Sequence, residues 1–175
     1  GLEDIDASLK LVRLPENRER LEKIKALLTG YNTSAEELGK IQTQFLDSVT
    51  KRGAIAPNWA RQYESLLAMP ALAALGNRRE VEAEIRDANA AFHATRAAAW
   101  RYEFAGGREL KDAVDREVAR TLQLLKHARE AAGERTVATA VDRLAEVGTS
   151  FQSLQEQMAS LSQRFGEIVT TRTLP

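Results

Sequence analysis

The C-terminal quarter of the chain carries an apolar pattern that few folds can satisfy. Apolar residues recur at alternating steps of three and four between Val137 and Ile168, and the residues between them are mostly Glu, Gln, Ser, Arg and Thr. This alternation is typical of helices that pack at a shallow angle, as in coiled coils and four-helix bundles. It predicts one helix from about Glu134 to Arg172. The stripe consists of Val137, Ala140, Leu144, Val147, Phe151, Leu154, Met158, Leu161, Phe165 and Ile168.

A second stripe with the same seven-residue period runs through the first half of the chain. Its register is interrupted only by Gln42 and Arg52. The residues predicted to face inward are Leu21, Ile24, Leu28, Tyr31, Ala35, Leu38, Phe45, Val49, Ala56, Trp59, Tyr63 and Leu66.

The stripe keeps its phase across residues that often end helices, among them Pro57. A reversing loop would have no reason to preserve that phase, so we predict one helix from about Glu16 to Ala68. Pro57 would kink it, because proline cannot donate to the carbonyl four residues earlier. The alternative is a helical hairpin that turns near Gly53.

Two more helices are predicted in the middle of the chain. Asn77 is a suitable N-cap with Glu80 three residues later, as in a capping box. This helix would end at Ala105-Gly106-Gly107, and the next would run from about Leu110 to Gly133. The inward residues of the first of these helices, the one after Asn77, would be Val81, Ile85, Ala88, Phe92, Thr95, Ala99 and Tyr102.

The ends and the composition complete the fold prediction. Residues 2–14 read as a short amphipathic piece, and 69–76 read as a turn in which 71–75 could hold a short helix. No useful β-type alternation appears. At 175 residues the chain is long enough for one domain with a core, and too short for two comfortable ones. We therefore predict an all-α, elongated, antiparallel bundle of four-helix type with heptad-like packing, as a single domain over 1–175.

Composition excludes several functions. Twenty-five Lys and Arg balance twenty-five Asp and Glu, and the charges are interspersed, so nothing indicates nucleic acid or an anionic membrane as a partner. There is no cysteine, which excludes disulfides, thiolate metal sites and cysteine nucleophiles. No apolar run approaches the roughly 20 residues that a membrane span needs.

Motifs for catalysis or metal binding are missing. Di-metal helical bundles need Glu-x-x-His pairs, but Ala90 and Leu124 stand three residues before His93 and His127. Phosphate loops and nucleophile elbows are also missing. We predict no enzyme activity, no cofactor and no metal. A phosphotransfer domain that uses His127 is the alternative, although the small residues that such domains place after the histidine are lacking.

The inward stripe of the helix after Asn77 loses bulk at Thr95, Ala99 and Tyr102. A small or polar layer within a bundle is where a pocket between helices can form. Asn89 and Arg96 flank this layer, and a guanidinium can fork onto a carboxylate with two parallel hydrogen bonds. The structural alternative is that Thr95 and Tyr102 form local hydrogen bonds and that Arg96 pairs with Glu103 or with a neighbouring helix.

Three further arginines are weaker ligand candidates. Arg52 lies on the core register, where a charge needs a partner: a carboxylate of a neighbouring helix, a second subunit, a ligand or solvent. Arg61 is off that register and reads as a surface residue, and Arg101 lies beyond the polar layer.

Residues 100–110 form an aromatic-rich helix end, Trp-Arg-Tyr-Glu-Phe-Ala-Gly-Gly-Arg-Glu-Leu. This segment resembles one in the ligand-binding domains of bacterial methyl-accepting chemotaxis proteins, with Ala-Gly-Gly where Thr-Gly-Asp is frequent in those receptors. Residues 27–52 are similar to their long helix, and 151–165 to the helix that returns to the membrane. The helical bimodular type is the most similar, followed by the four-helix-bundle type. A full bimodular domain is longer than this chain.

The resemblance implies a dimeric sensor on the periplasmic side of the bacterial inner membrane, anchored by spans outside this sequence. It would bind a small organic acid between helices and signal by helix displacement. Arg96 is then the first residue to test, with Asn89, Thr95, Tyr102, Arg101, Arg52 and Arg61 as further ligand-binding candidates. The alternative is a scaffold or adaptor that dimerises or docks partner helices without a small-molecule ligand.

Overall fold

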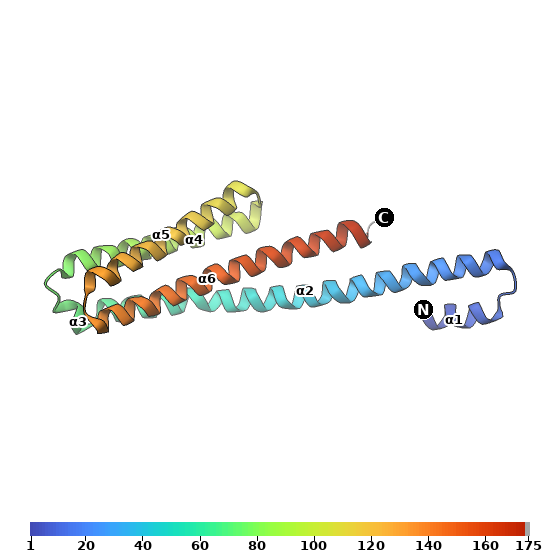
Figure 1. The fold of residues 1–175 in the computed structure, drawn as a ribbon, viewed down its shortest axis with the longest axis horizontal. Helices are drawn as coiled ribbons and strands as arrows, with labels where there is room; N and C mark the ends of the chain where they lie inside the picture. Colours follow the sequence, from blue (N-terminus) through green and yellow to red (C-terminus); the bar gives the residue numbers. More distant parts are fainter. Residues whose placement is uncertain (174–175) are drawn as a thin grey trace. The chain divides into compact units, whose positions relative to one another are not determined.

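The computed structural model describes residues 1–173, and the chain is 92% helical (Figure 1). The predicted all-α fold of long antiparallel helices is confirmed. The helices in chain order are α1 (Leu2–Leu11), α2 (Pro15–Leu67), α3 (Pro70–Ala73), α4 (Arg78–Ala105), α5 (Arg108–Ala132) and α6 (Arg135–Ile168), followed by a π-helical segment, η1 (Val169–Thr173).

Helix α2 is continuous over 53 residues, so the prediction of one long helix is confirmed and the hairpin at Gly53 is wrong. Pro57 lies inside the helix. Pro57 has no N–H to donate to the Gly53 carbonyl. Gly53 and Pro57 are both exposed, so that carbonyl is open to water. A proline on the solvent-exposed face of a helix removes one backbone hydrogen bond without leaving a buried polar group unsatisfied.

Glycines end α4 and α5 as predicted. Gly106 and Gly107 have φ of 66° and 93°, and Gly133 has φ of 60°, a left-handed conformation that L side chains rarely adopt. The predicted capping box at Asn77 is wrong, because the Asn77 side chain makes no cap hydrogen bond. Its Nδ2 instead donates to the carbonyl of Ala131 at 2.8 Å, which joins the start of α4 to the end of α5.

The chain divides into two compact units that share α2 and α6. Unit 2 spans residues 49–157, and unit 1 combines residues 1–48 with 158–175. The predicted single domain over 1–175 stays a prediction. No helix among residues 1–173 is long and apolar enough to cross a membrane.

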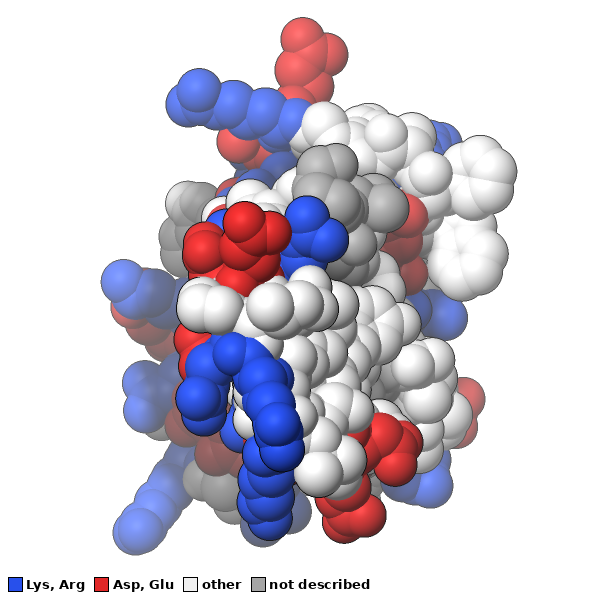
Figure 2. Space-filling view, turned by 90° about the vertical axis from the view of Figure 1, so that its right-hand side faces the viewer, with Lys and Arg blue, Asp and Glu red and all other residues white. Residues whose placement is uncertain are grey.

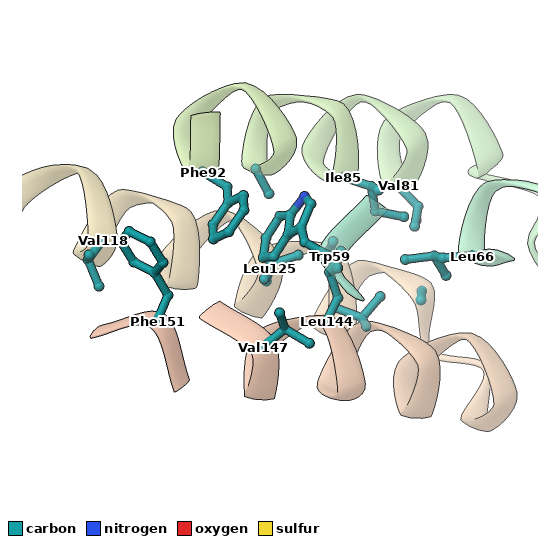
Figure 3. Packing of buried hydrophobic residues seen from close by; sticks show 14 of the residues in the cluster. Trp59, Leu66, Val81, Ile85, Phe92, Val118, Leu125, Leu144, Val147 and Phe151 are labelled. Atoms are coloured by element: carbon teal, nitrogen blue, oxygen red, sulfur yellow. The ribbon is translucent and has the colours of Figure 1, made fainter. Parts of the chain in front are cut away.

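Unit 2 is a bundle with a continuous dry core. The indole of Trp59 stacks on Phe92 with ring centroids 3.8 Å apart, and Phe151 meets the edge of Phe92 at 5.6 Å (Figure 3). These rings come from α2, α4 and α6. Leu125 of α5 is also fully buried, so four helices close around one core.

Unit 1 has a much smaller core. Ile41 of α2 packs with Leu161 and Ile168 of α6, and Leu38 and Phe45 lie half-buried beside them. Helix α1 has no buried residue and is tied to α2 by the ion pair of Asp6 with Lys25.

The predicted register of α2 is partly wrong in unit 1. Ile24 and Tyr31 are exposed, whereas Ser34, Ile41 and Ser48 are buried. The cause is geometric: a helix of 3.6 residues per turn drifts by about 20° per heptad, so the buried line leaves a strict seven-residue register over a long helix. Three other residues that were predicted to face inward are also exposed, namely Ala35, Val49 and Phe165 of α6.

Candidate ligand-binding pocket

Unit 2 contains a cavity of about 610 Å³ between α2, α4 and α6. Arg52, Arg96 and Arg101 line it together with apolar side chains such as Phe151. An apolar cavity of a few hundred cubic ångströms with a few convergent polar groups is the usual form of a small-molecule site. The arginines come from two helices, two of them from α4.

Arg52 has the partner that its register position requires. Its Nη1 pairs with Oε1 of Glu103 on α4, and the side chain is 17% exposed. Gln155 Nε2 of α6 donates to the same Glu103 oxygen at 3.2 Å. Burial lowers the pKa of Arg52, because desolvation disfavours the charged guanidinium. Of the partners considered for Arg52, the structure has a carboxylate from a neighbouring helix.

Arg96 and Arg101 line the cavity from α4, and both are exposed. Nη1 of Arg96 lies 3.5 Å from Nδ1 of His93, which also lines the cavity. Between them on the helix, Trp100 adds an indole that is 69% exposed. Cationic groups that are not buried in ion pairs can reorient toward an anion without a large cost in desolvation.

The residues of the predicted polar layer lie elsewhere. Asn89 Oδ1 accepts a hydrogen bond from Trp59 Nε1 at 2.8 Å, and Thr95 Oγ1 donates to the carbonyl of Ala91 at 2.9 Å. Thr95 is 1% exposed, and the void beside it has no room for a water-sized molecule. Tyr102 packs half-buried against the core. The layer is therefore packed, and the cavity opens on the neighbouring face of α4.

Arg61 lies exposed on α2, outside the cavity lining. The structure thus brings together Arg52, Arg96 and Arg101 of the seven candidates, and it does not bring Arg61, Asn89, Thr95 or Tyr102 to the cavity wall.

Sequence reasoning missed Gln155 and the pairing of Glu103 with Arg52. Gln155 follows Leu154 on the helix and is 9% exposed, although it is off the apolar stripe. Helix α6 therefore lines the cavity with one polar side chain, Gln155, and one apolar side chain, Phe151. The charge on the core register at position 52 indicated that a partner was needed, but it left open which one; Glu103 was considered as a partner of Arg96, and it pairs with Arg52 instead.

Unit 1 has a separate, largely apolar groove of about 430 Å³. It is lined by Ile41, Phe45 and Leu46 of α2 and by Leu161 and Phe165 of α6. Leu46 and Phe165 are 57% and 43% exposed. The groove has few polar groups to orient a small molecule.

The face of the molecule in Figure 2 carries charged side chains of both signs, with Lys and Arg interspersed with Asp and Glu. Among residues 1–173, no group of three or more His, Asp or Glu side chains is placed to hold a metal ion.

Comparisons with protein-family models, curated proteins and solved structures found no match to this chain. The fold is therefore a helical bundle of long helices for which no family is identified.

Proposed function

We propose that this chain is the extracytoplasmic ligand-binding domain of a chemoreceptor that senses a small organic acid. The observation that carries the proposal is the convergence of Arg52, Arg96 and Arg101 on one cavity with apolar walls. Guanidinium groups bind carboxylates with paired, charge-assisted hydrogen bonds.

The helices around the cavity suit a signal carried by helix displacement. A ligand there touches α2, α4 and α6 at once, so a change at the cavity alters how these helices pack. Both α2 and α6 are long helices that extend beyond the cavity-lining residues. A small shift of a continuous helix is a recognised form of switching. In this proposal the full protein is anchored in the inner membrane, and the sensor lies on its periplasmic side.

Calorimetric titration tests ligand binding. The purified chain is titrated with acetate, butyrate, benzoate and phenylacetate, and with benzamide as an uncharged analogue. Arg96→Ala is expected to weaken carboxylate binding by about tenfold, because a hydrogen bond to a charged group contributes roughly 1.5 kcal/mol or more. Arg61→Ala is the matched control, since Arg61 lies outside the cavity lining. Equal loss in both variants, or no heat with any carboxylate, contradicts the proposal.

We further propose that the sensor is a homodimer joined through unit 1. Large apolar side chains on α2 there are open to solvent: Leu27 is 74% exposed and Tyr31 57%. Light scattering coupled to size exclusion tests this. Leu27→Glu is expected to raise the monomer fraction, whereas Ala26→Glu, at a neighbouring exposed position, serves as the control for added charge. A monomeric parent chain rejects the dimer.

The same exposed apolar side chains favour a second candidate function, a scaffold that dimerises or docks partner helices without a small-molecule ligand. Helical faces with apolar residues at heptad spacing are the usual docking surface for another helix. A chain that dimerises through unit 1 but binds none of the carboxylates supports the scaffold over the sensor.

A further inference from the structure

Glu103 occupies a position that helix electrostatics disfavour. It lies in the last turn of α4, which ends at Ala105 and has no basic residue in that turn. The free carbonyls at a helix C-terminus carry partial negative charge, so a carboxylate there is repelled unless something else holds it. The interactions of Glu103 with other helices therefore decide where its side chain lies.

Two groups from other helices hold this carboxylate. Arg52 of α2 and Gln155 of α6 both donate to Oε1 of Glu103. Both donors line the cavity, whereas Glu103 does not. The side chain of Arg52 thus lines the cavity while its guanidinium pairs with a carboxylate that lies outside the cavity lining.

We propose that the ligand is a carboxylate with an apolar body, and that its carboxylate replaces Glu103 as the acceptor of Arg52. This inference rests on the proposed function and names the ligand class and the switch at the same site. Arg52 lines the cavity and is already paired with the Glu103 carboxylate. Two carboxylates on one cation repel each other, so a ligand carboxylate that binds Arg52 competes with Glu103 for it. The apolar body fits the remaining wall, which includes Val49, Ala56 and Phe151.

The exchange releases the end of α4. Once Arg52 has turned to the ligand, only the hydrogen bond from Gln155 holds the Glu103 carboxylate against the repulsion of the helix end. Beyond Tyr102, which packs against the core, the turn has few other restraints: Phe104 is 92% exposed, and Gly106 and Gly107 follow at positive φ. Ligand binding therefore loosens the last turn of α4, and the loss of the Arg52 ion pair weakens the contact of α4 with α2 at this point.

The first test compares ligand affinity in Glu103→Gln and the parent chain. Glutamine keeps an oxygen that can accept from Gln155 but removes the competing charge. Benzoate is expected to bind the variant about fivefold more tightly, as for the loss of an ion pair worth about 1 kcal/mol. Benzamide has no charge to pair with Arg52 and should not gain. Glu109→Gln, an exposed glutamate in the first turn of α5, controls for the change in net charge.

The second test follows amide hydrogen exchange at residues 103–106. Its main readout is in the parent chain, so it does not depend on how a variant folds. Benzoate is expected to speed exchange there in the parent chain. In Glu103→Gln these amides should exchange quickly without ligand and change little when benzoate is added. Their exchange in Glu109→Gln should match the parent chain.

The outcomes separate the two proposals. If benzoate binds the parent chain but binds Glu103→Gln equally or more weakly, or if benzoate slows exchange at 103–106, the carboxylate exchange is rejected while the sensor proposal stands. If carboxylates bind but benzoate and phenylacetate bind no better than acetate, the apolar body is rejected. If no carboxylate binds any of the three proteins, the sensor proposal fails and the exchange fails with it.

Discussion

Units 1 and 2 are built on the same two helices, yet residues on the same predicted register are buried in one unit and exposed in the other. On α2, Trp59 and Tyr31 were placed on one predicted register, and they are 1% and 57% exposed. In unit 2 the helices α4 and α5 complete the bundle, whereas the core of unit 1 is formed by α2 and α6 residues alone. A heptad stripe thus predicts a helix and its seam, but the number of helices around it determines how wide a face is buried.

Polar contacts between helices differ in burial. Buried hydroxyls donate within their own helix in both units, as Ser48 does to the carbonyl of Gln44 in unit 1. In unit 2 a core residue, Trp59, also donates to Asn89 of another helix. In unit 1 the polar contacts between helices include partly exposed ion pairs, such as that of Glu37 with Arg164.

The largest expected effect comes from truncating the aromatic stack. Trp59→Ala should lower the free energy of unfolding by about 3–5 kcal/mol, because it removes a buried indole, leaves a cavity and deprives Asn89 of its donor. Tyr31→Ala, on the same helix in unit 1, should cost no more than about 0.5 kcal/mol in a monomer. Urea unfolding followed by circular dichroism measures both.

A loss above about 2 kcal/mol for Tyr31→Ala would break the contrast between the units. Repeating the measurement over a range of protein concentrations shows where such a loss comes from, since a dimer interface contributes stability that depends on concentration.

The fold was predictable because its signals are local. The stripe at 137–168 and the glycines at 106, 107 and 133 each record a short-range requirement, either a buried seam or a positive φ. The drift of the buried line to Ser34 and Ile41 was not predictable from a fixed seven-residue register, since it depends on which helix lies opposite.

The cavity was only half predictable. The on-register charge at Arg52 required a partner, and that partner is an acid on a neighbouring helix. The position of the cavity was not readable from Thr95 and Tyr102, because a threonine that bonds to its own helix packs as well as an apolar residue of similar size. Which face of α4 stays open depends on the side chains of α2 and α6, which no pattern within α4 records.

A smaller effect distinguishes packing around two glycines in helices. A Cβ at Gly39 in unit 1 would meet nothing within 4 Å, so Gly39→Ala should stabilise the chain by about 0.5–1 kcal/mol through helix propensity. A Cβ at Gly148 in unit 2 would lie 3.3 Å from Cδ2 of Leu122 and 3.6 Å from Cζ3 of Trp59. Crowding there should cancel the gain and leave Gly148→Ala within about 0.5 kcal/mol of zero. Thermal unfolding of both variants tests this, and an equal gain at both positions would mean that the two units are packed alike.

A still smaller effect concerns the start of α6 and depends on pH. The Glu134 carboxylate accepts from the backbone N–H groups of Thr136 and Val137 at 2.9 and 2.8 Å, and from the Thr136 hydroxyl at 2.8 Å. These backbone hydrogen bonds lower the pKa of Glu134 below its usual value of 4.5. The stabilisation is therefore complete above the unfolded-state pKa and is lost as the pH falls through the lower folded-state pKa. Glu134→Gln should reduce the Tm near pH 7, and the difference from the parent chain should shrink once the pH falls below about 4.5. Glu37→Gln, which removes the exposed ion pairs of unit 1 with Arg164 and Arg172, should lower the Tm less, and 1 M salt should erase its effect. A Glu134→Gln difference that persists undiminished at pH 2.5 would show that the side chain acts through packing rather than through its charged hydrogen bonds.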